Sequence, residues 1–378
     1  MVVFHQMVKG YETLKSTELY PLLFAKLREA LSRPSFVQFR TMDEQPSLTQ
    51  VTKLMPIDAV ANVEIHGKAY QIIAGAKANG QPMSARRAIE QLRYYMAYLP
   101  PTVRKYGVFL APFVSPEAAQ ICLESGVGYV DLAGNAHLEF ADVFVEIRTA
   151  ENPFKELREN RPLFSSKSER VLRVLLTPPL RSWKVTELSQ VSRVSLGQVS
   201  TVRRHLLDRE WATADNQGLT IIQPEELARA WQAAYKPRRE TEKRYTLLHG
   251  ASLEQAIKSA IGEAFPDKHL VLASFSAARW MAPFARQNTT YFYATKTGKA
   301  VAERFLELQS AAQGENVVIW YPKEDDVFSS SIEVVPGIRC SSQVQTWLDL
   351  SLAGDRGKEA AEHLLQQELI PAWRSALG

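Results

Sequence analysis

Cysteine is almost absent from this chain: Cys122 and Cys340 are the only two among 378 residues. Two cysteines are too few for a disulfide framework or a zinc site, so we expect both thiols to be inert and unpaired. Long apolar runs are also missing, since none approaches the roughly 20 residues that span a bilayer. Residues 1–6 show no signal-peptide pattern. The sequence therefore predicts a cytoplasmic protein without membrane contacts.

Positive charge is concentrated in one part of the chain. The net charge is only +4 overall, whereas residues 165–244 contain 15 Lys or Arg against 9 Asp or Glu. Such a basic region supplies the salt-dependent, sequence-independent part of nucleic-acid affinity. The length, with 46% hydrophobic residues, indicates two or three domains with sizeable cores.

The segment from Val185 to Ile221 has the pattern of a winged helix-turn-helix. A short amphipathic helix over 185–190 and a turn over 191–194 precede a second helix over 195–207. Ser195 with Gln198 three residues later predicts a capping box at the start of the second helix. Strands over 211–214 and 219–222 then predict a hairpin wing, and a helix over 168–176 precedes the motif.

The second helix is expected to place its apolar side chains inward and its polar ones toward DNA. At about 100° per residue, Val199, Val202 and Leu206 share the core face. Gly197 would let the backbone approach a phosphate or a base edge. Arg203, nearer the apolar side, is expected to bind phosphate or form a salt bridge. The candidate DNA-binding residues are Lys184, Arg193, Ser195, Gly197, Gln198, Ser200, Thr201, Arg203, Arg204 and His205.

Two alternatives stay open for this region. The helical hairpin could pack against protein instead of DNA. The run Lys236–Arg239 with Lys243 and Arg244 is either a set of phosphate contacts or a solvated linker between domains.

The first 150 residues alternate strands and helices, which predicts a mixed α/β or α+β domain. Its strand hairpin over 58–65 and 69–74, with Asp58 and the downstream Lys77, resembles the PD-(D/E)xK nuclease fold. That chemistry requires a second acid two positions before the lysine, to hold a divalent metal with the aspartate. Gly75 occupies this position, and Glu64 is a candidate stand-in. Alternatively, Asp58 and Lys77 are only charges at the edge of the hairpin. We therefore expect a degenerate domain that is not an enzyme, with an active metal-dependent nuclease as the alternative.

Two further polar sites are interpreted as structural. Asp131, before the turn at Gly134-Asn135, either caps that turn or contacts a partner, and we favour the cap. Residues 126–138 lack the lysine and helix of a phosphate loop, so no cofactor is expected. The C-terminal third alternates strands and helices as an α/β unit. There, Ser276 lacks paired acids, and Asp325-Asp326 is expected to be a solvated loop.

The order of several motifs resembles the AbiEi-type antitoxin regulators of type IV toxin-antitoxin systems. These motifs are 128–135, 152–154, 163–172, 194–200, 275–279, 347–350 and 356–361. The resemblance implies a transcriptional regulator that represses its own operon, with double-stranded operator DNA and a nucleotidyltransferase-like toxin as partners. A homodimer is expected, because one recognition helix reads only a short half-site. The predicted architecture is mixed α+β: a nuclease-like α/β domain (1–155), a winged helix-turn-helix (163–236) and a C-terminal α/β domain (245–378).

Overall fold

The computed structural model describes residues 16–44, 46, 57–148, 163–267, 269–284, 287–310 and 314–377. The 152–154 motif lies outside these residues. Two compact units are present, residues 1–162 with 204–210 and residues 163–203 with 211–378. The mixed α/β fold class predicted from the sequence is confirmed.

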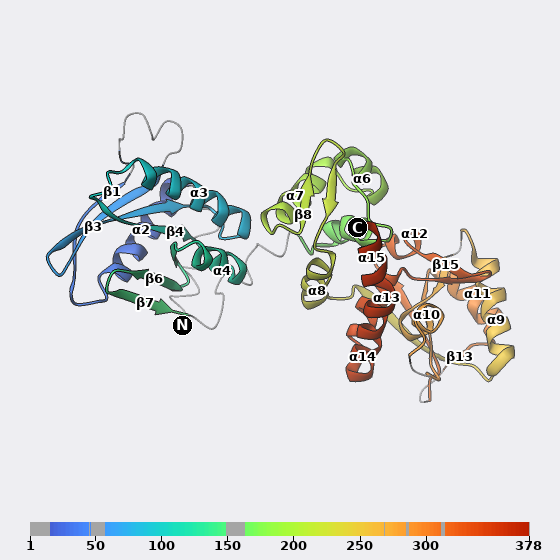
Figure 1. Ribbon diagram of the computed structural model, residues 1–378. Coiled ribbons are helices and arrows are strands. Elements are labelled where there is room, and N and C mark those ends of the chain that lie inside the picture. Colours follow the sequence, from blue (N-terminus) through green and yellow to red (C-terminus); the bar gives the residue numbers. More distant parts are fainter. Residues whose placement is uncertain are drawn as a thin grey trace. The chain divides into compact units, whose positions relative to one another are not determined.

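The first unit contains one seven-stranded sheet whose strands follow each other in sequence order (Figure 1). Strands β3, β4 and β5 are parallel, and all other neighbours are antiparallel. The β2–β3 hairpin turns at His66 and Gly67, whose φ angles of 49° and 75° suit a tight turn. The elements are α2 (Ser16–Leu31), β1 (Val37–Glu44), β2 (Ala59–Ile65), β3 (Lys68–Ala76), α3 (Pro82–Tyr98), β4 (Arg104–Ala111), α4 (Pro116–Glu124), β5 (Gly128–Asp131), β6 (Ala136–Phe140) and β7 (Val143–Ile147).

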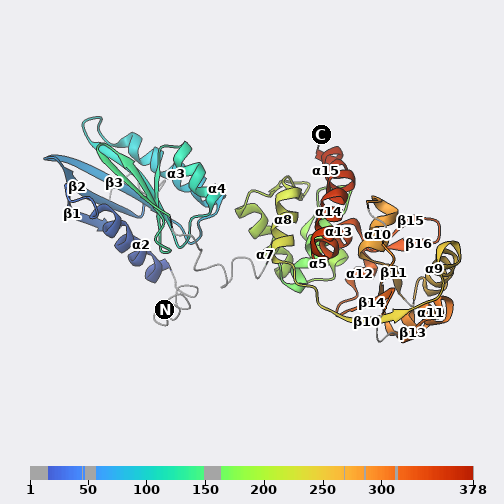
Figure 2. The ribbon, with the colours of Figure 1, turned by 90° about the horizontal axis from the view of Figure 1, so that it is seen from below.

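Both faces of this sheet are covered by helices, as Figure 2 shows. Leu23, Leu27 and Leu31 of α2 pack against one face. Helices α3 and α4 cover the other face, where Ile73 and Phe109 are fully buried. Burial on both faces explains the nearly continuous apolar character of the central strands.

The segment predicted to be a winged helix, called the winged-helix segment below, contains four helices and a two-stranded hairpin. These are α5 (Ser166–Leu176), α6 (Val185–Ser192), α7 (Leu196–Asp208), β8 (Ala212–Ala214), β9 (Leu219–Ile221) and α8 (Pro224–Ala234). Residues 204–210 of this segment group with the first unit and the rest with the second. The hairpin pairs Ala212 with Ile221 and Ala214 with Leu219, as the sequence predicted. Helix α8 was not predicted, although Pro224 at its first turn is a typical start signal.

A second seven-stranded sheet, of mixed direction, follows in the order β13-β10-β14-β12-β11-β16-β15. Helices α9 and α11 pack on one face, and α13 is joined to the other through Tyr293 and Asp349. The elements are β10 (Arg239–Tyr245), α9 (Gly250–Ala264), β11 (Leu270–Leu272), α10 (Ser274–Met281), β12 (Thr290–Ala294), α11 (Lys296–Leu306), β13 (Gln309–Ser310), β14 (Val317–Pro322), α12 (Asp326–Ser329), β15 (Ile332–Val335), β16 (Ile338–Cys340), α13 (Gln343–Ser351), α14 (Gly354–Leu364), a π-helical turn (Leu365–Leu369) and α15 (Ile370–Leu377).

The cysteines behave as predicted: Cys122 and Cys340 are free and buried. Burial raises the pKa of each thiol to about 12, because the thiolate would lose its hydration. Among the described helices, none has the length and apolar character that a membrane crossing requires.

Candidate nucleic-acid interface

The helix-turn-helix is formed by α6 and α7, with Arg193 to Ser195 between them. Arg193 ends α6 in the left-handed region, at φ 53° and ψ 43°, so the chain reverses within three residues. Ser195 Oγ accepts from the backbone N–H of Gln198 at 3.4 Å. The predicted capping box is only half formed, because the Gln198 side chain does not return to Ser195. Its Nε2 donates instead to Ser168 Oγ of α5 at 2.9 Å, which fastens α7 to α5.

Helix α7 has the register predicted from the sequence. Val199, Val202 and Leu206 are fully buried, and the exposed stripe consists of Leu196, Gly197, Ser200 and Arg204. No described atom lies within 4 Å of the position that a Cβ on Gly197 would occupy. The protein's own packing therefore does not require glycine there, and the backbone is open to another molecule.

Glu187 attracts Lys184 and Asp208 attracts Arg204. No ion pair within 4 Å is formed among the described residues by four cations of the motif: Lys184, Arg193, Arg203 and Arg204. All are exposed except Arg203, which is partly covered. His205 is also partly covered, and burial with Arg209 and Arg204 nearby lowers its pKa to about 4. It is therefore neutral at pH 7. Thr201 Oγ1 donates to the Gly197 carbonyl at 3.0 Å, so its hydroxyl proton is used within the helix.

The wing is neutral to acidic at its tip. Residues 212–221 contain neither Lys nor Arg, and Asp215 accepts from the backbone N–H groups of Gln217 and Gly218. Trp183 extends the hairpin by exchanging two 2.9 Å backbone hydrogen bonds with Leu219. Gly218 is required here, because a Cβ would lie 2.4 Å from the Trp183 carbonyl oxygen. Positive charge is thus carried by α7 and the turn before it.

Only the start of the basic run from Lys236 to Arg244 fits a solvated linker, because residues 236–238 are exposed and outside any helix or strand. Its residues from Arg239 form β10, a strand inside the second sheet that begins before the predicted domain start at Tyr245. Arg239 is paired with Asp349, Lys243 with Glu315, and Arg244 with Glu242 and Glu303. The charges of β10 are therefore neutralised within the fold.

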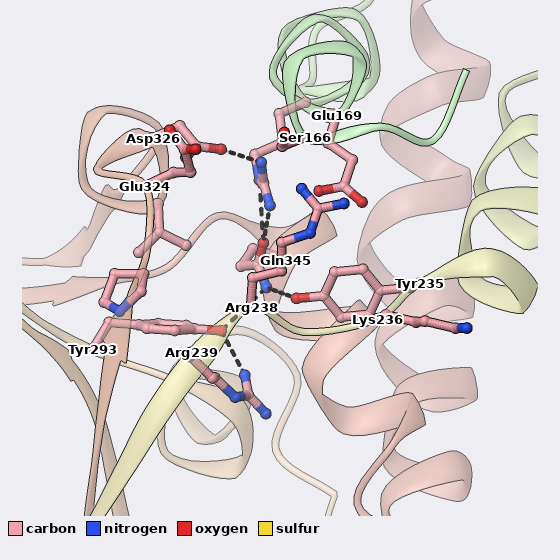
Figure 3. A pocket seen from close by; sticks show the side chains of 13 residues that line it. Ser166, Glu169, Tyr235, Lys236, Arg238, Arg239, Tyr293, Glu324, Asp326 and Gln345 are labelled. Atoms are coloured by element: carbon pink, nitrogen blue, oxygen red, sulfur yellow. Dashed lines mark hydrogen bonds and ion pairs between the residues drawn. The ribbon is translucent and has the colours of Figure 1, made fainter. Parts of the chain in front are cut away.

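A buried polar network joins the winged-helix segment to the second sheet (Figure 3). Arg173 of α5 donates to Gln345 of α13 at 3.1 and 2.6 Å and pairs with Asp326. Gln345 Nε2 in turn donates to the Tyr235 hydroxyl at 2.8 Å. Asp326 contradicts the expected solvated loop, because it is mostly buried by this ion pair.

The network continues to Asp349, a fully buried carboxylate on α13. Tyr293 donates to both of its oxygens at 2.9 Å, and Arg239 forms the ion pair. Burial raises the pKa of Asp349, and Arg239 opposes that shift. The hollow beside this network measures about 50 Å³, space for one or two waters and too little for a metabolite. The network of Arg173, Gln345 and Asp349 therefore has a structural role, and we call these three residues the buried joint.

Asp58 and Lys77 come together in the first unit as predicted, with 3.8 Å between Asp58 Oδ2 and Lys77 Nζ. Asp58 also accepts from the Ala76 N–H at 2.8 Å. Burial raises the pKa of Asp58 and lowers the pKa of Lys77, while their mutual attraction opposes both shifts. Glu64 cannot replace the missing acid, because it lies six residues along β2 and pairs with Arg40 at 2.9 Å.

Helix α3 covers the position of the missing acid. A Cβ on Gly75 would lie 3.5 Å from Ala88 Cβ and 3.6 Å from Leu92 Cγ, so a carboxylate there would enter an apolar contact. Within the described ranges, no three His, Cys, Asp or Glu side chains gather as a metal site. Asp58 and Lys77 therefore form an ion pair at the end of β3, without a second acid beside them at position 75.

Two smaller predictions concern single side chains. Asp131 is fully buried and accepts from the N–H of Val114 and from the N–H and side-chain amide of Asn135, so it caps its turn. Ser276 accepts from the Tyr291 N–H at 2.9 Å, which is also a structural contact.

The sequence reasoning did not find the joint residues Arg173, Gln345 and Asp349. One signal was present: Asp349 stands between Trp347, Leu348 and Leu350, an apolar setting in which a carboxylate requires a buried partner. Comparison with known proteins found no matching family model, no matching curated protein and no matching solved structure.

Proposed function

We propose that this protein is a DNA-binding transcriptional regulator that uses α7 as its recognition helix. The carrying observation is the exposed stripe of α7, where Gly197 leaves the backbone open and the exposed Arg204 forms no ion pair within 4 Å in the described part of the chain. A helix of 13 residues with this stripe fits the major groove, and the wing follows it as in other winged helices.

The motif order that resembles AbiEi-type regulators extends this proposal. On that resemblance the protein represses its own operon as a homodimer in the cytoplasm and acts as antitoxin to a nucleotidyltransferase-like toxin. The DNA-binding part can be tested without the toxin.

The test is fluorescence anisotropy with duplex DNA from upstream of the gene and a scrambled duplex, at about 150 mM salt, where non-specific binding is weak. We expect tight binding of the upstream duplex only. Thr201→Ala with Arg204→Ala should abolish this preference while circular dichroism stays unchanged. Arg279→Ala, which changes an arginine 70% exposed in the second sheet's domain, is the matched control. Equal weak binding of both duplexes would refute the proposal.

A second candidate is a metal-dependent nuclease, favoured by the 3.8 Å approach of Lys77 to Asp58. It predicts magnesium- or manganese-dependent cleavage of DNA that disappears in Asp58→Ala and in Lys77→Ala. The apolar contact above Gly75 argues against it, and we expect no cleavage with either metal. Cleavage that survives in both variants would come from a contaminant.

A further inference from the structure

The exposed side chain within the first turn of α7 is apolar. Leu196, the first residue of the helix proposed to enter DNA, is 51% exposed. A single exposed leucine is ordinary on a protein surface. This one is followed on the same face by Gly197, with no described atom within 4 Å of its would-be Cβ, and by the exposed Ser200. The leucine side chain can therefore be reached closely from outside.

Three polar side chains nearby form hydrogen bonds within the protein. Gln198 donates to Ser168, Ser195 accepts from the Gln198 N–H, and Thr201 donates to the Gly197 carbonyl. An amide that reads adenine needs both its donor and its acceptor free for the base edge. The Gln198 side chain is committed to α5 in this structure, which leaves Leu196 as the most prominent group of the first turn.

The charge around Leu196 indicates which molecule covers it. Arg193 precedes it by three residues and Arg204 follows two turns later on the same face. Both are exposed, and neither forms an ion pair within 4 Å in the described part of the chain, although Asp208 lies near Arg204. A second copy of this face would bring like charges together, whereas DNA phosphates would neutralise them. Charge complementarity therefore favours DNA as the occupant.

We infer that Leu196 contacts the C5-methyl groups of thymine, so the bound duplex carries thymine where the start of α7 enters the major groove. The thymine methyl is the only apolar group that the four bases present in that groove. This inference rests on the proposed DNA-binding function and adds the chemical feature that is recognised.

The experiment begins with duplexes selected from a random pool by the full-length protein. Each thymine of the selected duplex is then replaced singly by deoxyuridine, which removes the methyl and keeps the hydrogen-bonding edge. Burial of one methyl-sized group corresponds to an affinity change of about fourfold. We expect a loss of about fourfold at one or two positions and little change elsewhere.

The protein side of the test is Leu196→Ala, with Leu352→Ala as the matched control because Leu352 is similarly exposed at 49%. In Leu196→Ala the affinities for the thymine and deoxyuridine duplexes should become equal. In Leu352→Ala the difference should persist. The two substitutions, one in protein and one in DNA, form a double-mutant cycle that isolates their contact.

The outcomes test the thymine contact and the proposed DNA-binding function separately. Selected sequences that bind tightly but are indifferent to deoxyuridine, or a methyl effect that survives in Leu196→Ala, would overturn the thymine contact and leave the regulator intact. Failure to select any sequence above background would refute the regulator itself. A change of oligomeric state in Leu196→Ala, with the methyl effect retained, would assign the leucine to an interface between copies.

Discussion

Replacing Arg204 by glutamine should weaken the salt dependence of DNA binding in a predictable way. The helix-turn-helix provides four cations that form no ion pair within 4 Å among the described side chains: Lys184, Arg193, Arg203 and Arg204. If each neutralises one phosphate, the logarithm of affinity falls with the logarithm of salt at a slope of about −3.6. Affinity should then fall about 150-fold between about 50 mM and about 200 mM salt.

With Arg204 removed, three contacts remain and the slope becomes about −2.7, which corresponds to a loss of about 40-fold over the same range. The assay is anisotropy titration of both proteins at several salt concentrations. The control is Arg279→Gln, because this side chain is 70% exposed, lies outside the helix-turn-helix and pairs with Glu254 at 3.9 Å. An Arg204→Gln slope equal to that of the original protein would show that Arg204 does not contact phosphate. An equally reduced slope in Arg279→Gln would show that DNA binding depends on the overall positive charge of the protein and not on a defined set of phosphate contacts.

Three further outcomes concern stability and reactivity. Asp349→Ala leaves the Arg239 guanidinium buried without its carboxylate, so it should lower the free energy of unfolding by about 3–5 kcal/mol. Urea titration measures this loss, and a value below about 1 kcal/mol would contradict the buried pair. Gly75→Asp should cost about 1–3 kcal/mol because it crowds α3, without giving magnesium-dependent cleavage; measurable cleavage would show that the position can hold a catalytic acid. Cys122 and Cys340 should stay unreactive toward a disulfide reagent at pH 8 and react in urea, since burial raises each pKa to about 12; labelling of the folded protein would refute their burial.

Elements that are defined by local pattern were predicted from the sequence. The β2–β3 hairpin, the buried strand β4 and the register of α7 follow from alternation, apolar runs and helical periodicity, which need no knowledge of distant residues. The expected pair of Asp58 and Lys77 also forms, because the hairpin register brings their strand ends together.

Strand β10 shows why other elements could not be predicted. Its sequence, Arg-Glu-Thr-Glu-Lys-Arg-Tyr, is typical of a solvated segment. It is a strand because its charges find partners far along the chain: Glu242 accepts from Lys299, and Lys243 pairs with Glu315. Helix α11 was missed although Thr295 caps it through the Gly298 N–H, a local signal that periodicity reasoning overlooked.

The sequence predicted the helices and the hairpin of the candidate site, but only some of the contacts that its side chains make. Residues of α7 can be assigned to a face of the helix from their spacing, but spacing does not reveal the hydrogen-bond partners of a side chain. The amide of Gln198 is an example, since its partner Ser168 lies 30 residues earlier on α5. The joint of Arg173, Gln345 and Asp349 likewise unites residues more than 170 positions apart.

The buried joint limits which segments of this chain can be transferred to another protein. A chimera that carries only the winged-helix segment into another protein would bring Arg173 without Gln345 and Asp326, and Leu176 without the Trp373 N–H that donates to its carbonyl at 2.9 Å. Each orphaned group would then require a new partner or water. Grafts that test the proposed DNA recognition should therefore exchange only the exposed stripe of α7 and leave the inward faces of α5 and α8 in place.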